Sequence, residues 1–166
     1  MKVAVVGGGP AGLYFATLWK RRHPDARVRV YEQNPSDATW GFGVVFSDRA
    51  LEFLHADDPE THDLITPKME TWQDMTLVHR GQTVTIDGVG FSSIGRLKLL
   101  QLLQERARDV GAELIFDTVI PTVAELGDAD LILAADGVNS VVRRGYEGDF
   151  GMSLSYLPNK FAWYGV

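Results

Sequence analysis

The chain has 166 residues, the length of one ordinary domain, and its hydrophobic content of 45% is enough for a packed core. A net charge of −6 without a long basic run argues against nucleic acid and anionic membrane surfaces as partners, and the absence of cysteine excludes disulfides, thiolate metal sites and thiol nucleophiles. No apolar run approaches the roughly 20 residues of a membrane helix, and a strand at the initiator methionine leaves no room for a signal peptide, so we expect a soluble cytoplasmic protein.

The segment from Val3 to Glu32 carries the clearest pattern in the chain. The apolar run Val3–Val6 is too short for a helix and rich in β-branched residues, which is typical of a strand buried on both faces. A glycine-rich turn, a helical pattern over 11–22 and a second strand over 27–31 follow in that order. This strand–helix–strand order predicts an α/β fold with a parallel sheet.

The glycine-rich turn satisfies G-x-G-x-x-G at Gly7, Gly9 and Gly12. In such a turn the first glycine permits the tight change of direction, the second lets a pyrophosphate approach the backbone, and the third lets helix and strand pack closely. The N–H groups that begin the helix then hold the phosphates. Glu32 lies 20 residues beyond Gly12, where its carboxylate can accept a hydrogen bond from a ribose 2′-OH, so the segment predicts a dinucleotide site.

Two later segments leave alternatives open. In the apolar stretch Gly41–Phe46, the glycines indicate either the close approach of a ligand or a bulged strand. Arg96 begins a leucine-rich helix that Gly111 ends, and a cation at that position opposes the helix dipole by about 0.3–1 kcal/mol. Arg96 is therefore either an anion-binding residue or a solvated side chain.

Residues 47–66 are expected to form a short helix followed by a loop. Ser47 or Asp48 caps a short helix to Leu54, with Leu51 and Leu54 as its buried contacts, and residues 57–66 are expected to form a loop with one helical turn.

Two histidines, His55 and His62, fall in the same region. Neither has an acidic residue or a second histidine at ligand spacing in the sequence. Solvated or capping roles are therefore predicted for both, in preference to metal binding.

The alternation of strand and helix is interrupted over residues 71–93. Strands are predicted at 75–79, 83–86 and 89–94, separated by Arg80-Gly81-Gln82 and by Asp87-Gly88, and Asp-Gly favours a hairpin turn. Such an antiparallel insert is expected to belong to a second layer or domain.

Two further strands are predicted over 112–116 and 130–135, the second of them fully buried. It ends in Asp136-Gly137, and because ligands of open parallel sheets lie outside the carboxyl ends of the strands, Asp136 is placed for a site. A turn without function is the alternative. The final segment, 153–166, has β-strand character and includes an apolar strand at 161–166.

The chain resembles the FAD-dependent aromatic hydroxylases, the single-component flavoprotein monooxygenases, in three separated motifs. These are Gly7–Gly12 with Glu32, Arg96 at the start of its helix, and D-G-x-x-S-x-x-R over 136–143. In that family the first motif holds the ADP part of FAD, the arginine contacts the phosphate or ribose region of the flavin, and the third is tied to both FAD and nicotinamide binding. The likeness covers most of residues 1–150.

The resemblance implies FAD as cofactor, NADH or NADPH as co-substrate, and hydroxylation of an aromatic ring by O₂ through a flavin C4a-hydroperoxide. The sequence itself predicts no metal site, and no side chain of residues 1–166 is identified as a catalytic base. The implied cofactor-binding residues are Gly7, Gly9, Pro10, Ala11, Gly12, Glu32, Gln33, Val44, Arg96, Asp136 and Gly137.

A closer likeness is carried by Gly41–Phe46 and Asn159–Gly165. Both segments look like the branch that contains the violacein-pathway tryptophan hydroxylase and the monooxygenase portions of salicyloyl-CoA and 2-aminobenzoyl-CoA hydroxylases. This likeness implies a small aromatic substrate, with a CoA thioester and an indole or tryptophan as the candidates.

The chain departs from the family in one motif, a later Gly-Asp near the flavin ribityl chain. Gly148-Asp149 comes only 11 residues after Gly137, with no substrate domain between them. We therefore expect residues 1–166 to be the N-terminal part of a longer enzyme and inactive alone. Two other classes stay open: a nicotinamide-dependent dehydrogenase, because the glycine pattern and Glu32 do not distinguish NAD from FAD, and a non-catalytic nucleotide-binding fragment.

The predicted fold is a Rossmann-like FAD-binding domain of the α/β class with a β-rich antiparallel insert. The FAD-binding domain is expected over 1–70 and 95–150. Residues 71–94 and 151–166 are expected to begin a β-rich substrate domain that is incomplete in this chain.

Overall fold

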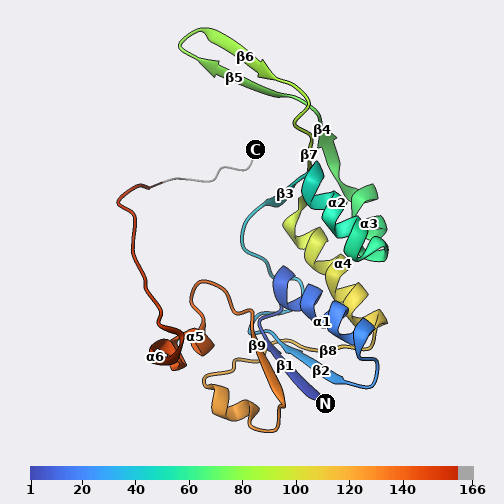
Figure 1. The fold of residues 1–166 in the computed structure, drawn as a ribbon, viewed down its shortest axis with the longest axis vertical. Coiled ribbons are helices and arrows are strands. Elements are labelled where there is room, and N and C mark those ends of the chain that lie inside the picture. The colour runs from blue at the N-terminus through green and yellow to red at the C-terminus, as the bar shows by residue number, and fades with distance from the viewer. Residues whose placement is uncertain (161–166) are drawn as a thin grey trace. The chain divides into compact units, whose positions relative to one another are not determined.

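The computed structural model describes residues 1–160 (Figure 1). The chain divides into two compact units, one formed by residues 1–36 with the chain from 107 onward, the other by residues 37–106. Each unit has sheet structure of its own. The predicted division into FAD-binding and substrate domains concerns cofactor and substrate rather than compactness, and it stays a prediction.

The first unit contains a four-stranded parallel sheet in the order β8-β2-β1-β9. Strands from the two ends of the sequence lie side by side in it (Figure 1), and in the register Val5 pairs with Val30 on one side and Leu133 on the other. This arrangement confirms the α/β fold with a parallel sheet. The strands are β1 (Lys2–Val6), β2 (Arg27–Tyr31), β8 (Glu113–Ile115) and β9 (Leu131–Ala134).

Both faces of β1 are covered, as its uninterrupted apolar sequence predicts. Helix α1 (Pro10–Arg22) packs on β1 and β2 and buries Leu13 and Ala16 completely. On the other face, Ala4 and Val6 form a buried cluster with Leu126 and Val142. Leu126 comes from a 3₁₀ turn, η2 (Val123–Leu126), and Val142 from helix α5 (Val141–Gly145).

The edges of this sheet differ from the sequence prediction. Strand β9, predicted to be fully buried, is half-buried and exposed at Ala134, because it forms one edge of the sheet among the described residues. At the opposite edge Arg29 Nε donates a hydrogen bond to Glu113 at 2.8 Å. This bond raises the pKa of the Arg29 guanidinium above its ordinary value and ties β8 to β2.

Residues 135–160, which follow β9, contain little regular structure. Helices α5 and α6 (Glu147–Phe150) are short, and residues 152–160 contain no strand, so the β character predicted for 153–160 is wrong. Side chains there have too few apolar neighbours to specify a strand; Tyr156 and Leu157 are 88% and 81% exposed. The predicted apolar strand at 161–166 lies outside the described residues.

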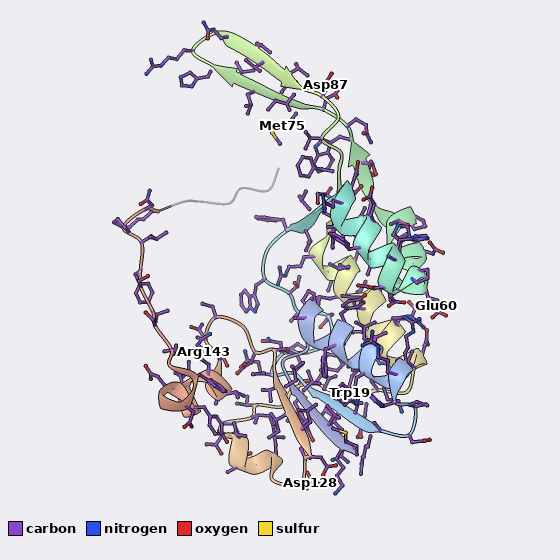
Figure 2. All side chains as sticks on the ribbon, viewed as in Figure 1. Trp19, Glu60, Met75, Asp87, Asp128 and Arg143 are labelled. Atoms are coloured by element: carbon purple, nitrogen blue, oxygen red, sulfur yellow. The ribbon has the colours of Figure 1, made fainter. Side chains whose placement is uncertain are left out.

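The second unit contains an antiparallel sheet in the order β3-β7-β4. A separate two-stranded hairpin projects from Met75 and returns at Asp87 (Figure 2). The strands of the sheet are β3 (Gly43–Ser47), β4 (Glu70–Trp72) and β7 (Phe91–Gly95), and those of the hairpin are β5 (Met75–His79) and β6 (Gln82–Ile86).

The predicted hairpin at Asp87-Gly88 is wrong. Strand β6 pairs with β5 alone, through a turn at Arg80-Gly81 where φ is +48° and +78°. Two positive φ values match the type I′ turn, whose twist suits a two-residue hairpin. Strand β7 pairs instead with β3 and β4, far away in sequence, so Asp87-Gly88 is a connection between two sheets.

In the second unit the predicted helix cap at Ser47 is confirmed, whereas the loop predicted over 57–66 is wrong. Helix α2 (Asp48–Asp57) is capped by Ser47, whose Oγ accepts from Ala50 N at 3.2 Å, but its predicted contacts Leu51 and Leu54 are only half-buried. Residues predicted to form a loop contain helix α3 (Pro59–Ile65), followed by a 3₁₀ turn, η1 (Thr66–Lys68). A buried aspartate cap before a proline at the first helical position starts α3.

Helix α4 (Arg96–Asp109) begins at the predicted arginine and is followed by Gly111 with φ +89°. The leucine spacing of this segment places Leu97, Leu100, Leu103 and Ala107 on one face, and of these Leu97 is only half-buried. No helix among residues 1–160 is both long enough and apolar enough to cross a membrane. The buried apolar residues of α4 are Leu99, Leu100, Leu102, Leu103 and Ala107.

Candidate dinucleotide-binding site

The residues that follow β1, β2 and β9 lie together at the carboxyl end of the parallel sheet. Gly7 follows β1, and its N–H donates to Tyr31 O, the last residue of β2, at 2.8 Å. A Cβ built on Gly7 would lie 2.3 Å from Ala135 O, the residue after β9. The glycine turn therefore lies beside the end of β2 and the start of the Asp136 loop. In open parallel sheets, ligands bind at this carboxyl end of the strands.

The three glycines of the motif differ in what surrounds them. Gly7 has φ +105°, a conformation that L-residues rarely adopt. A Cβ on Gly12 would lie 2.0 Å from Gly7 O and 3.1 Å from Val5 Cγ1, so only glycine lets α1 pack this closely on β1. A Cβ on Gly9 would meet no atom within 4 Å, which leaves open space beside the backbone for a ligand.

The start of α1 is suited to an anion. Gly9 is the N-cap residue and offers no side-chain cap, Pro10 occupies the first turn, and no acidic residue lies in that turn. Ala11 is exposed, so no large side chain covers the helix start. The positive end of a helix of 13 residues is thus available to a phosphate.

Glu32 is held in place by backbone and side-chain donors. Its Oε2 accepts from Gly8 N at 2.8 Å, and its Oε1 accepts from Asn34 N at 2.9 Å and from Asn34 Nδ2 at 2.7 Å. A carboxylate oxygen can accept two hydrogen bonds, so Oε2 retains capacity for a ribose hydroxyl. Gln33, also predicted at the site, is exposed.

Gly8 and Asn34 were not identified from the sequence. Gly8 is one of the variable positions of the glycine motif, and a Cβ there would lie 2.8 Å from Glu32 Cβ. Asn34 lies two residues after Glu32, in a polar turn whose composition does not indicate which side chain points back. Only the ability of an asparagine to bond to nearby backbone and acidic groups gave a signal.

Asp136 has one satisfied and one unsatisfied oxygen. Its Oδ2 accepts from Val141 N at 2.6 Å, whereas Oδ1 is buried without a hydrogen-bond partner among the described residues. A buried carboxylate oxygen without a donor is costly. A ligand hydroxyl or ordered water at the end of β9 would supply the donor.

The loop after Asp136 is folded on itself. Gly137 has φ +76°, and Ser140 Oγ caps α5 by accepting from Arg143 N at 3.0 Å. The Arg143 guanidinium donates to Val138 O (Arg143 is labelled in Figure 2), and Arg144 Nη1 donates to Asn139 O at 2.6 Å. The order of residue types in this motif therefore has a structural role in shaping the loop.

The remaining predicted residues, Val44 and Arg96, belong to the second unit. Arg96 N donates to Phe42 O at 3.0 Å, and Arg96 Nε is buried without a hydrogen-bond partner among the described residues. Gly41 has φ +97°, and a Cβ there would lie 3.8 Å from Arg96 Cδ. An unpaired guanidinium nitrogen at a helix start is the arrangement that an anion would complete.

Val44 is half-buried in β3 and pairs with Ile94. A Cβ on Gly43 would lie 3.2 Å from Ile94 O, so the glycine of this strand accommodates a neighbouring backbone. The structure thus groups the predicted residues in two sets, the glycine motif with Glu32 and Asp136 in one unit, and Val44 with Arg96 in the other.

A parallel sheet with a glycine-rich turn, an uncapped helix start and an acidic residue at the end of β2 defines a Rossmann-like dinucleotide-binding unit. Residues 5–56 match the family model described as an NAD(P)-binding Rossmann-like domain. The chain is 43% identical over its whole length to salicyloyl-CoA 5-hydroxylase of a Streptomyces species, of which it covers 32%. It is 31% identical to protodeoxyviolaceinate monooxygenase of Chromobacterium violaceum, over all of this chain and 45% of that protein.

A solved structure of 2-methyl-3-hydroxypyridine-5-carboxylic acid oxygenase superposes on 86% of this chain and 41% of its own, with a TM-score of 0.74 and 25% sequence identity. The similarity to these oxygenases confirms the resemblance to the FAD-dependent aromatic hydroxylases that the motifs of the chain indicate. It spans about a third to under half of the length of the curated relatives it matches.

Proposed function

We propose that the protein containing residues 1–166 is an FAD-dependent monooxygenase that uses NADH or NADPH and O₂ to hydroxylate a small aromatic substrate. The proposal rests on the grouping of Gly9, Glu32 and Asp136 at the carboxyl end of the parallel sheet. Open space beside Gly9, a carboxylate that retains acceptor capacity and an unpaired buried oxygen are what the ADP half of FAD requires.

In this proposal, different described residues bind different parts of FAD. The pyrophosphate is assigned to Gly9 and the start of α1, with Pro10 and Ala11 shaping the helix start. The adenosine ribose is assigned to Glu32, beside Gln33, and a further hydroxyl to the Asp136-Gly137 loop. Val44 and Arg96 are assigned to the flavin side, with Arg96 neutralising a phosphate or contacting a ribose.

Bound flavin supplies the redox and oxygen chemistry of such an enzyme. In this proposal the residues of this chain bind and orient the flavin, and none of them is assigned as the proton acceptor. The substrate class is proposed from the relatives, one named for a CoA thioester of an aromatic acid and another for a violacein precursor. A small aromatic substrate, as a CoA thioester or an indole, is therefore the first choice for assay.

Substitution of Glu32 by alanine is expected to weaken FAD binding to the full-length protein by about 1–3 kcal/mol, because ribose hydroxyls lose a charged acceptor. Titration of apoprotein with FAD, followed by flavin fluorescence, measures the change. Glu32→Gln is the matched control, since the amide keeps the acceptor oxygen without the charge. If the FAD affinity of Glu32→Ala is unchanged, the adenosine ribose does not bind to Glu32. The negative charge of Glu32 also disfavours an NADP 2′-phosphate at this position, because the two charges repel.

Substitution of Arg96 by alanine is expected to lower FAD occupancy while the melting temperature of the apoprotein stays nearly unchanged. The reason is that a cation at a helix start opposes the dipole unless an anion is bound. Flavin content and melting temperature are measured on the same preparation, with Lys98→Ala, an exposed residue of the same helix, as control. Reduced apoprotein stability with normal flavin content would instead assign Arg96 a structural role.

A nicotinamide-dependent dehydrogenase is the second candidate, favoured by the description of the family model that matches residues 5–56. The visible absorption spectrum of the purified full-length protein separates the two. A flavin spectrum with NAD(P)H oxidation stimulated by an aromatic substrate supports the monooxygenase. A colourless protein that reduces NAD⁺ supports the dehydrogenase.

A further inference from the structure

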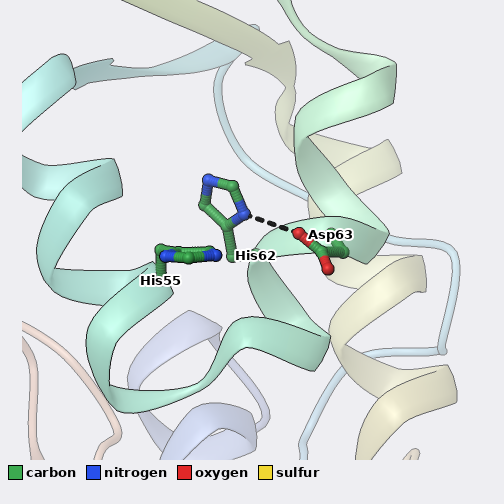
Figure 3. A group of neighbouring side chains, drawn as sticks. All are labelled: His55, His62 and Asp63. Carbon is green, nitrogen blue, oxygen red and sulfur yellow. Dashed lines mark hydrogen bonds and ion pairs between the residues drawn. The ribbon is translucent and has the colours of Figure 1, made fainter.

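His55, His62 and Asp63 form a side-chain group on α2 and α3 (Figure 3). One ligand atom of each residue lies within 4.8 Å of those of the other two. The two imidazole rings meet edge to face with their centroids 4.7 Å apart, and His62 Nδ1 lies 2.9 Å from Asp63 Oδ1. Because an ionised carboxylate has only acceptors, Nδ1 of His62 is the donor in this bond.

The expectation that His55 and His62 have no partner at ligand spacing is wrong. In one continuous helix, residues seven positions apart would be about 10.5 Å apart along the axis. The break at Asp58-Pro59 ends α2 and starts α3, and the two helices pack against each other. This change of direction brings the two rings together.

The joint between the helices is firmly held. Asp58 is fully buried, and its carboxylate accepts from Thr61 N at 3.3 Å and from the Thr61 hydroxyl. Arg106 pairs with Glu60 and lies 3.9 Å from Asp58. The backbone beneath the three side chains is thus fixed, while His55 is exposed and the Asp63 side chain is 71% exposed.

We propose that His55, His62 and Asp63 bind one divalent transition-metal ion of the Zn²⁺ type. Two imidazole nitrogens and one carboxylate oxygen are a ligand set that such ions prefer, and with bonds of about 2.0–2.2 Å a tetrahedral site needs ligand atoms ~3.3 Å apart. His62 Nδ1 and Asp63 Oδ1 are 2.9 Å apart, slightly closer than this separation, and rotation of the exposed His55 and Asp63 side chains would bring the three ligand atoms to it. The ion replaces the proton on His62 Nδ1, which leaves to solvent, and water completes the coordination.

The surrounding charge favours a cation. Residues 48–68 carry six carboxylates against two basic side chains, and Arg106 of α4 adds a third cation beside Asp58 and Glu60. Negative potential raises the local concentration of cations without selecting among them. Selection for Zn²⁺ over Mg²⁺ or Ca²⁺ rests on the two imidazoles, since the latter ions prefer oxygen ligands. The carboxylates are Asp48, Glu52, Asp57, Asp58, Glu60 and Asp63, and the basic residues are Arg49 and Lys68.

Calorimetric titration of the 166-residue chain with zinc chloride tests the site. One saturable Zn²⁺ per chain is expected, with affinity lowered at least tenfold by His55→Ala and by His62→Ala, and about tenfold by Asp63→Asn. His79→Ala is the matched control, because His79 is an exposed histidine on the separate hairpin. It is expected to leave the affinity unchanged.

Two further measurements keep the result decisive. Each variant is melted without metal to show that it folds, and Zn²⁺ is expected to shift the ring proton NMR signals of only these two histidines in the unsubstituted chain. An excess of Mg²⁺ is expected not to displace Zn²⁺. Absence of saturable binding, an affinity unaltered in the His55→Ala and His62→Ala variants, or displacement by Mg²⁺ would each overturn the site.

Discussion

Substitution of Gly7 by alanine is expected to lower the free energy of unfolding by about 2–6 kcal/mol, a large fraction of a domain's stability. Two costs add. The residue must keep φ at +105°, and its new Cβ would lie 2.3 Å from Ala135 O and 2.8 Å from Asp136 N, both backbone atoms that cannot turn aside. Relief would require β1 and β9 to separate at the edge where Val6 O accepts from Ala135 N at 2.7 Å.

Comparison with Gly137→Ala separates the cost of backbone strain from the cost of the steric clash. Gly137 also has positive φ, +76°, but a Cβ there would meet no atom within 4 Å, so only the backbone strain applies. Urea unfolding of both variants is expected to show Gly7→Ala as the more destabilised. Equal losses would mean that the turn does not press against the end of β9.

The Rossmann-like unit could be predicted from the sequence because each of its signals is local. Val3–Val6 is apolar throughout, so it is buried whichever face it presents, and the glycines at 7, 9 and 12 are spaced by the geometry of one turn and one helix start. Glu32 follows at the end of a strand of five residues whose alternation is clear. Nothing in the pattern from Val3 to Glu32 depends on which distant strand lies beside it.

The errors lie where distant partners decide the structure. Strand β7 pairs with β3 and β4 rather than with its neighbour β6, a choice that the Asp87-Gly88 turn signal does not encode. The extent of burial of β9 depends on its place at the sheet edge. The periodicity of a helix assumes a continuous axis, so the approach of His55 to His62 across the α2–α3 joint was invisible to it.

The site residues show the same division. Gly9 and Glu32 are found by spacing, but the hydrogen bonds from Gly8 and Asn34 that fix the Glu32 carboxylate depend on how one loop turns back. The unpaired Oδ1 of Asp136 likewise becomes visible only when burial is known. Spacing therefore predicts which residues face a ligand, whereas the coordinates show how firmly each of them is positioned.

Substitution of Gly9 by alanine is expected to abolish most FAD binding in the full-length protein while leaving the fold intact. Gly9 has φ −75° and ψ 178°, values open to alanine, and its Cβ would meet no protein atom within 4 Å. The same Cβ would occupy the space assigned to the pyrophosphate. Loss of the close approach to the helix start is expected to weaken FAD by about 2–4 kcal/mol, or roughly 30- to 1,000-fold in Kd.

Gly9→Ala and Gly7→Ala thus have opposite expected profiles, since one removes binding and the other removes stability. Gly148→Ala is the control for the substitution itself, because Gly148 in α6 lies outside the site and a Cβ there also meets nothing within 4 Å. FAD titration and thermal unfolding of the three variants distinguish the outcomes. Undiminished FAD affinity in Gly9→Ala would show that no pyrophosphate lies against this glycine, and the proposed cofactor site would have to be abandoned.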